Sequence, residues 1–182
     1  LKQYNVDCLY LLPLTQSSSE YKKGEVGSPY SVKNFFKVEK DYHDSLLENA
    51  FSPDDEFAAF LEAAHMLGIR IMLDFVPRTC SRDNDLILEH PEWFYWIDTD
   101  EIHTFKPPYI DELDFEQPSL DNLHILYNHE EVKKHLDKFK FDPKTQDPKK
   151  WDEFVKKYKN NPDFLFEIEK EFGLVTVPGF SD

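Results

Sequence analysis

Two short runs of apolar residues, each closed by a proline, organise the first half of the chain. They occupy residues 6–12 and 69–76. The second run is apolar at both parities except at Arg70 and Asp74, which is the pattern of a strand buried on both faces. Proline lacks the N–H that a sheet requires, so we expect each strand to end there.

A segment with the signals of a capped amphipathic helix lies between these runs. Ser52 is a good N-cap, Pro53 suits the first helical position and Asp55 completes a capping box. Gly68 fits the left-handed residue just past the end. Apolar residues recur at helical spacing on one face: Phe57, Phe60, Leu61, Ala64 and Leu67. The strand, helix and strand predict a βαβ unit with parallel strands.

The rest of the chain alternates between loops and helices. The polar segment 15–24 is typical of a surface loop. Residues 78–128 are rich in proline, acid and aromatics, with turns such as that at Pro118. Residues 92–97 fit either an aromatic strand or a short helical turn. The remaining elements that we expect are extended chain at 34–38, helices after residues 129, 147 and 161, and extended chain at 174–177.

Charge narrows the classes of partner. The formal net charge is −15, which argues against nucleic acid and anionic membranes because both are bound through lysine and arginine. No apolar run is long enough to cross a bilayer. Cys8 and Cys80 are too few for a disulfide framework, so we expect reduced thiols and a cytoplasmic-type location. The chain begins with leucine, so we expect its true N-terminus to be missing.

The chemistry-bearing residues are few. The seven histidines lack metal spacing, and Asp83-Asn84-Asp85 lacks the rest of a calcium loop, so no metal is expected. A glycine-rich phosphate loop is absent too, and we expect no cofactor. Asp74 ends an otherwise apolar strand, where ligands bind in parallel sheets and barrels. It either binds a ligand or, as a structural carboxylate, caps the next loop or pairs with an arginine.

Several motifs occur in the order seen in one enzyme family. They are Leu-Tyr-Leu-Leu-Pro-Leu at 9–14, Gly-Ser-Pro-Tyr-Ser at 27–31, Phe-Phe-Lys-Val at 35–38 and the helix–strand segment 55–76. This order resembles the second and third β/α units of the alpha-amylase family of glycoside hydrolases. Residues 77–83, 90–97 and the ending 172–182 resemble more closely its maltosyltransferase branch.

The resemblance implies an α/β fold that is a fragment of a (β/α)8 TIM barrel. Residues 1–76 would be a partial catalytic barrel. Residues 77–182 would be an incomplete, mostly helical or irregular domain inserted after the third strand. The parent enzyme would cleave and transfer α-1,4-linked glucosyl or maltosyl units by a retaining mechanism, with two carboxylates roughly 5 Å apart.

The resemblance also assigns substrate contacts. Asp74 matches the family's aspartate at the end of the third strand, which braces the catalytic centre and its sugar. Tyr30 is a candidate for the tyrosine that stacks on the same sugar, although its spacing is two residues off. Arg78 and Thr79 replace an asparagine, commonly a calcium ligand, and a sugar-contacting histidine. We expect Arg78 and Arg82 to pair with acids of the inserted domain or with an anionic group such as phosphate.

The family's catalytic carboxylates come from the fourth, fifth and seventh strands, so we expect no catalytic residue in this chain and no activity from it alone. The expected partners are an α-glucan or maltooligosaccharide, phosphate or a phosphorylated sugar, and further copies joined at open sheet edges. One alternative is a non-catalytic carbohydrate-binding or interaction module using Trp93, Tyr95 or Trp96. Another is an unrelated small α/β protein. We expect Trp93 instead to be a core residue that seats the inserted domain.

Overall fold

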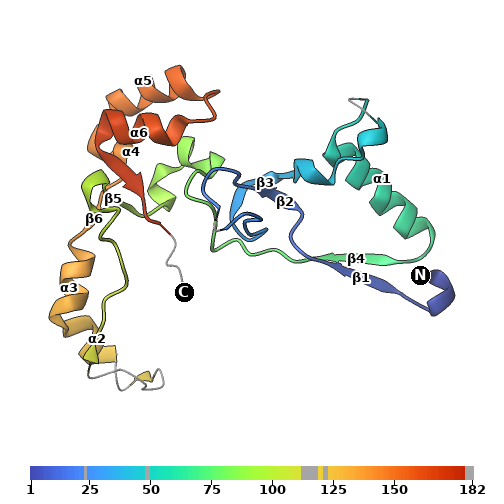
Figure 1. The fold of residues 1–182 in the computed structure, drawn as a ribbon, viewed down its shortest axis with the longest axis horizontal. Helices are drawn as coiled ribbons and strands as arrows, with labels where there is room; N and C mark the ends of the chain where they lie inside the picture. The colour runs from blue at the N-terminus through green and yellow to red at the C-terminus, as the bar shows by residue number, and fades with distance from the viewer. Residues whose placement is uncertain (23, 48–49, 112–118, 121–122, 179–182) are drawn as a thin grey trace. The chain divides into compact units, whose positions relative to one another are not determined.

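The computed structural model describes residues 1–22, 24–47, 50–111, 119–120 and 123–178. They form two compact units, Leu1–Asp85 and Leu86–Asp182, and each is described by itself. Figure 1 traces both units from the blue N-terminus to the red C-terminal region. The division expected between residues 76 and 77 comes from the family resemblance and stays a prediction.

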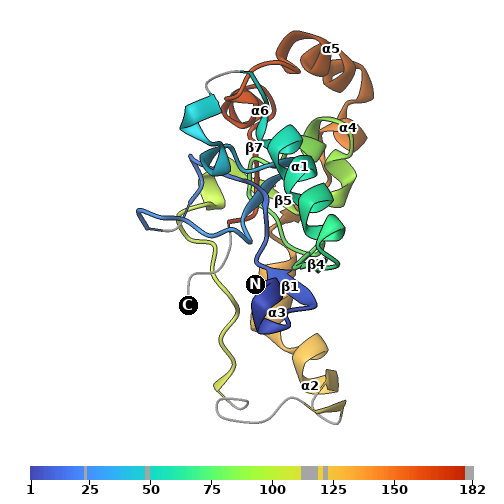
Figure 2. The same ribbon diagram turned by 90° about the vertical axis from the view of Figure 1, so that its right-hand side faces the viewer.

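The first unit contains the βαβ arrangement that the sequence predicts. Strands β1 (Cys8–Leu11) and β4 (Arg70–Leu73) pair in parallel, with Cys8 opposite Arg70 and Leu11 opposite Leu73. Helix α1 (Pro53–Met66) precedes β4 and packs beside it (Figure 1, Figure 2). The prediction of a parallel strand pair joined through a helix is therefore confirmed.

Helix α1 begins as predicted. The Asp55 N–H donates to the Ser52 hydroxyl oxygen at 3.2 Å, and the Ser52 N–H donates to the Asp55 carboxylate at 2.9 Å. This reciprocal capping box satisfies two of the N–H groups that a helix start leaves open. Gly68 follows the helix with φ of +68°, a conformation that glycine adopts without the clash of a Cβ.

The prediction that the second strand is buried on both faces is wrong. Met72 is 55% exposed and Leu73 is 46% exposed, whereas Ile69, just before the strand, is buried. Within the described residues the sheet has two strands and α1 packs against it, so most side chains of β4 have no neighbour to cover them. The apolar side chains of β4 are suited to burial, which this two-stranded sheet does not provide.

The polar segment after β1 is only partly a loop. Strand β2 (Thr15–Ser17) pairs antiparallel with β3 (Val32–Val38), which contains the extended chain expected at 34–38. Hydropathy could not show β2 because its three residues are polar. The Ser17 N–H and hydroxyl both donate to the Glu39 carboxylate, at 2.8 and 2.7 Å, and hold the strand in place. The described residues of this unit also form 3-10 turns at Lys2–Tyr4, Lys40–Tyr42 and Ser45–Leu47.

The second unit has a three-stranded antiparallel sheet. Strand β5 (Trp96–Asp98) lies between β6 (Phe139–Lys140) and β7 (Leu174–Thr176). Residues 92–97 thus combine the two predicted options, because a 3-10 turn at Pro91–Trp93 leads into β5. The other helical elements that the structure describes in full are turns Asp85–Leu88 and Thr99–Glu101 and helices α2 (Leu123–Asn128), α3 (Glu130–Leu136), α4 (Pro143–Gln146), α5 (Pro148–Tyr158) and α6 (Phe164–Phe172).

The core of the second unit is more complete than that of the first. Its fully buried members include Trp96, Ile97, Trp151, Phe154, Leu165, Ile168 and Val175. The helices begin and end near the predicted places: the Lys150 N–H donates to the Asp147 cap at 3.0 Å, and Gly173 ends α6 with φ of +67°. The N-cap of α6 is Asp163 rather than Asn161. Pro118 and the motif residues 179–182 lie outside the described residues.

Candidate functional site

Tyr30 and Asp74 meet in the first unit. Asp74 follows the last residue of β4, and its N–H continues the parallel pairing by donating to the Leu11 carbonyl at 2.9 Å. Tyr30 lies two residues before β3 begins at Val32. Its phenol hydroxyl donates to Asp74 Oδ2 at 2.7 Å across 44 residues of sequence. Two residues that the sequence placed in one candidate site are therefore in direct contact.

Asp74 raises the pKa of two tyrosines. Its hydrogen bond to Tyr30, with smaller contributions from burial and from the carboxylate charge, raises the pKa of Tyr30 above its ordinary value. A side-chain hydrogen bond to Asp74 likewise raises the pKa of Tyr10. Tyr10 was missed at the sequence level. The signal that could have found it is a tyrosine in an apolar strand, opposite Met72 in the parallel register.

This group has the chemistry of a polyol site. Asp74 is half-buried and Tyr30 is 39% exposed, so neither is sealed from a ligand. A carboxylate offers about four lone-pair positions, so the bond from the Tyr30 phenol leaves acceptor capacity for ligand hydroxyls. The phenol rings add apolar faces. The arrangement can bind and orient a ligand rich in hydroxyls.

Arg78 is not joined to this group. Its side chain is exposed, and among the described residues no hydrogen bond or ion pair links it to Asp74, to Tyr30 or to an acid. The nearby Arg82 is different, since its guanidinium lies over the Tyr21 ring with 4.9 Å to the ring centroid. The predicted pairing of Arg78 with an acid or with phosphate stays a prediction.

Two carboxylates of the Asp83-Asn84-Asp85 stretch contact side chains of β3. Asp83 forms an ion pair with Lys33 at 2.8 Å, and Asp85 accepts a hydrogen bond from Asn34 at 2.8 Å. In the part of the chain that the structure describes, no group of three or more metal-ligating side chains comes together. No helix within that part is long and apolar enough to cross a membrane.

The aromatic stretch that was the alternative sugar platform has two kinds of member. Trp96 is 1% exposed, and its indole N–H donates to the Pro91 carbonyl at 2.8 Å. Trp93 is 64% exposed and stacks on His90, with 3.9 Å between ring centroids. The expectation that Trp93 is a core residue is therefore wrong. The core position belongs to Trp96, because β5 begins there and turns its side chain inward.

Comparison with known proteins gives relatives but no matching family model. The chain is 31% identical over 106 residues to the alpha-1,4-glucan:maltose-1-phosphate maltosyltransferase of Cereibacter sphaeroides, covering 53% of this chain and 15% of that protein. It is 30% identical over 155 residues to the enzyme of that name from Mycolicibacterium smegmatis, covering 80% and 21%. The predicted resemblance to the maltosyltransferase-like branch of the alpha-amylase family is confirmed.

The alpha-amylase family also appears among the solved structures. An alpha-amylase from Lactobacillus plantarum is 31% identical and covers 72% of this chain and 27% of its own, at a TM-score of 0.42. That score is below the level that establishes a shared fold. The chain spans about a fifth or less of the length of the two maltosyltransferases. The substrate roles of Tyr30, Asp74 and Arg78 stay predictions.

Proposed function

We propose that this chain supplies part of the glucan-binding barrel of an alpha-amylase-family enzyme that cleaves or transfers α-1,4-linked maltosyl or glucosyl units. The observation that carries the proposal is the identity of about 30% to two proteins named alpha-1,4-glucan:maltose-1-phosphate maltosyltransferase. The proposed substrates are an α-glucan or maltooligosaccharide and a phosphorylated sugar such as maltose 1-phosphate. The parallel β1–β4 pair supports assignment to the second and third β/α units of a TIM barrel, with residues 77–182 inserted afterwards.

In this proposal Asp74 and Tyr30 form one sugar subsite. Asp74 lies at the carboxyl end of a parallel strand, which is the end of a (β/α)8 barrel that binds substrate. Its carboxylate accepts hydrogen bonds from sugar hydroxyls, and the Tyr30 ring packs on the apolar face of the sugar. Arg78, exposed four residues after Asp74, supplies a fixed positive charge for the phosphate of a sugar phosphate.

The proposed chemistry is retaining glycosyl transfer. A carboxylate displaces the leaving group from the anomeric carbon to form a glycosyl-enzyme, while a protonated carboxylic acid gives the leaving oxygen its proton and becomes the second carboxylate. A sugar hydroxyl then attacks and returns its proton to the second carboxylate. Both carboxylates would come from later barrel strands, so residues 1–182 alone would be inactive. The open edges of the two-stranded sheet would favour self-association of these residues.

A second candidate function is non-catalytic carbohydrate binding by the second unit. The observation that favours it is the exposed Trp93, whose ring is held flat against His90. His90 in turn contacts Glu92, with Nδ1 and Oε1 3.1 Å apart. A preorganised indole face is a ready surface for a sugar ring, and Trp93→Ala would abolish this binding while Asp74→Asn would leave it intact.

Turnover is tested first, and binding is tested separately. Phosphate release from maltose 1-phosphate with glycogen is measured for residues 1–182 and for the protein that the whole reading frame encodes. We expect no release from residues 1–182 and release with a retained anomeric configuration from the whole protein. Phosphate release by residues 1–182 would refute the proposed inactivity, and an inverted product would refute the mechanism.

Binding is measured by calorimetry with maltoheptaose on the full chain. A single subsite implies a Kd on the order of 1 mM, or about −4 kcal/mol. We expect Asp74→Asn to weaken it and Asp152→Asn, an exposed position on α5, to leave it unchanged. Equal affinity of both variants and the wild type would remove Asp74 from the site. If the wild type binds no glucan at all, the glucan proposal itself fails.

A further inference from the structure

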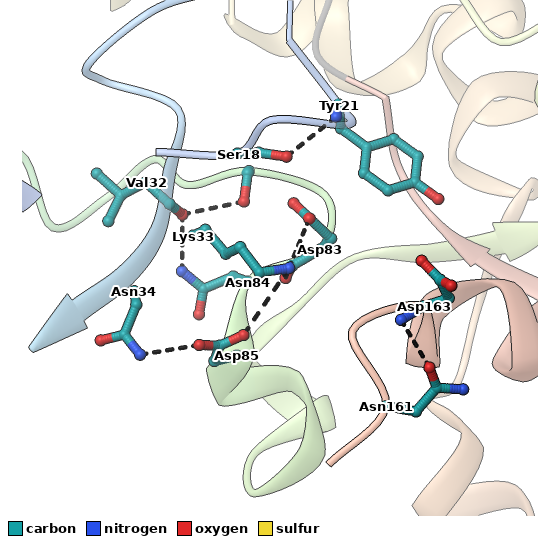
Figure 3. Close-up of polar contacts among 11 residues, drawn as sticks. Ser18, Tyr21, Val32, Lys33, Asn34, Asp83, Asn84, Asp85, Asn161 and Asp163 are labelled. Atoms are coloured by element: carbon teal, nitrogen blue, oxygen red, sulfur yellow. Dashed lines mark hydrogen bonds and ion pairs between the residues drawn. The ribbon is translucent and has the colours of Figure 1, made fainter. Parts of the chain in front are cut away.

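One buried carbonyl in the first unit accepts three hydrogen bonds. The Val32 carbonyl, at the start of β3, receives the Ser81 N–H at 2.9 Å and the Ser81 hydroxyl at 3.1 Å. The Asn84 side-chain amide donates to the same oxygen at 2.8 Å (Figure 3). Val32, Ser81 and Asn84 are all buried, and Asn84 is fully so. A carbonyl has two lone pairs, so this one is saturated.

An ion pair and a further hydrogen bond join residues 81–85 to the next two residues of β3. The Lys33 ammonium donates to Asp83 Oδ2 at 2.8 Å, and the Asn34 amide donates to Asp85 Oδ2 at 2.8 Å. Asp83 is also buried. We call Val32, Lys33, Asn34 and residues 81–85 the Val32 cluster. Buried polar networks hold one arrangement tightly, because a donor or acceptor left without its partner costs free energy.

The opposite edge of β3 is held at the same point. The Ser31 carbonyl accepts the Ser18 N–H at 3.1 Å, which extends the β2–β3 pairing by one bond. Consecutive carbonyls of a strand point to opposite edges, so the backbone just after Tyr30 is fastened on both sides.

The Tyr30–Asp74 contact is close to this cluster along the chain on both of its sides. Tyr30 is two residues before Val32, and Asp74 is seven residues before Ser81. We propose that the Val32 cluster is a positioning element that holds the Tyr30 hydroxyl on Asp74 and so pre-forms the sugar subsite. The inference rests on the proposed function for its substrate, but the Tyr30–Asp74 contact can be measured without any substrate. Ser81 and Asn84 are positioning residues and need not touch the sugar.

The test compares Asn84→Ala with Asn161→Ala in the full chain. Asn161 makes an exposed, local contact in the second unit, where its Oδ1 accepts the Asp163 N–H at 3.0 Å (Figure 3), so Asn161→Ala is the same substitution away from the cluster. The readout is the pKa of Tyr30, followed by NMR of ring-labelled tyrosine and assigned with Tyr30→Phe. We expect the pKa of Tyr30, raised in the wild type by its bond to Asp74, to fall toward its ordinary value in Asn84→Ala only.

Maltoheptaose affinity gives the second readout. The net contribution of one hydrogen bond predicts affinity that is roughly 3- to 10-fold weaker in Asn84→Ala and unchanged in Asn161→Ala. A folded Asn84→Ala with the wild-type pKa of Tyr30 would overturn the inference, whatever its affinity. If Asn84→Ala does not fold, Ser81→Ala, which keeps the backbone bond to Val32, decides by the same titration. If the wild type binds no glucan, the proposed function is wrong, and the titration of Tyr30 alone tests the positioning role of the Val32 cluster.

Discussion

Replacing Trp96 should cost far more stability than replacing Trp93, three residues earlier. Trp96 is 1% exposed, lies in the central strand of the second unit and donates its indole N–H to the Pro91 carbonyl at 2.8 Å. Truncating a buried tryptophan to alanine costs about 3–5 kcal/mol. The loss of a donor at the Pro91 carbonyl adds about 1 kcal/mol. We therefore expect Trp96→Ala to lower the free energy of unfolding by about 4–6 kcal/mol.

Trp93→Ala is the matched control. Trp93 is 64% exposed, and its stacking on His90 is the ring contact that the substitution removes. An aromatic pair contributes about 0.5–1.5 kcal/mol beyond its buried area, so we expect a loss no larger than that. The two variants make the same substitution at sites that differ in burial and in the indole N–H bond that Trp96 alone makes to the Pro91 carbonyl.

The assay is urea unfolding followed by far-UV circular dichroism, because each variant also changes tryptophan fluorescence. With a urea m-value of about 2 kcal/mol/M, Trp96→Ala should move the midpoint by about 2–3 M and Trp93→Ala by less than 1 M. A loss of about 3 kcal/mol or more in Trp93→Ala would refute the reasoning. It would mean that Trp93 is buried in the folded chain, as its sequence context alone suggested.

Four further predictions follow from individual contacts. Ser17→Ala should raise the pKa of Glu39, because burial raises that pKa and the hydrogen bonds from Ser17 are the main opposing effect. The lowered pKa of Glu39 stabilises the fold above about pH 4.5, and this stabilisation is lost as pH falls through the folded pKa. The urea midpoint of Ser17→Ala should therefore depend less on acid pH than that of the wild type. The pKa of Tyr30 is raised, so its protonated phenol stabilises the contact with Asp74 below about pH 10, and this stabilisation is lost as pH rises through the folded pKa. We expect calorimetry to show a loss of maltoheptaose affinity at alkaline pH in the wild type and no such loss in Tyr30→Phe. Asp55→Ala should lower the urea midpoint by opening the capping box, and a change within error would contradict the cap. Arg78→Gln should weaken phosphate binding or lower the melting temperature, and unchanged values of both would exclude the two roles expected of Arg78.

Local signals in the sequence predicted the elements whose causes are local. The cap of α1 depends on Ser52 and Asp55, three residues apart, so the chain segment itself contains the whole interaction. The glycine ends of α1 and α6 are equally local, because a positive φ is a property of one residue. The parallel pairing of β1 and β4 followed from the order strand, helix, strand.

Interactions between distant residues explain what the sequence did not reveal. Strand β2 is polar and exists through its pairing with β3 and the bonds from Ser17 to Glu39. The Val32 cluster joins residues about 50 positions apart, and the Asp83–Lys33 pair gives no periodic signal. In the candidate site, the strand pattern singled out Asp74 and the family resemblance added Tyr30, whereas Tyr10 joined them only when the strand register was known.

The exposed faces of β4 connect the fold to the proposed function. A two-stranded sheet is marginal in water, and here Met72 and Leu73 are about half exposed beside a helix whose own Phe60 is 42% exposed. Apolar side chains on both faces of β4 add no stability to this two-stranded sheet, because apolar area left in water is not buried by folding. The same residues become favourable once strands and helices cover them, as in a closed (β/α)8 barrel. Asp74 would then stay accessible at the carboxyl end while the faces of β4 are buried. A sugar subsite needs this combination, because a buried strand is rigid and holds the exposed binding residue in place.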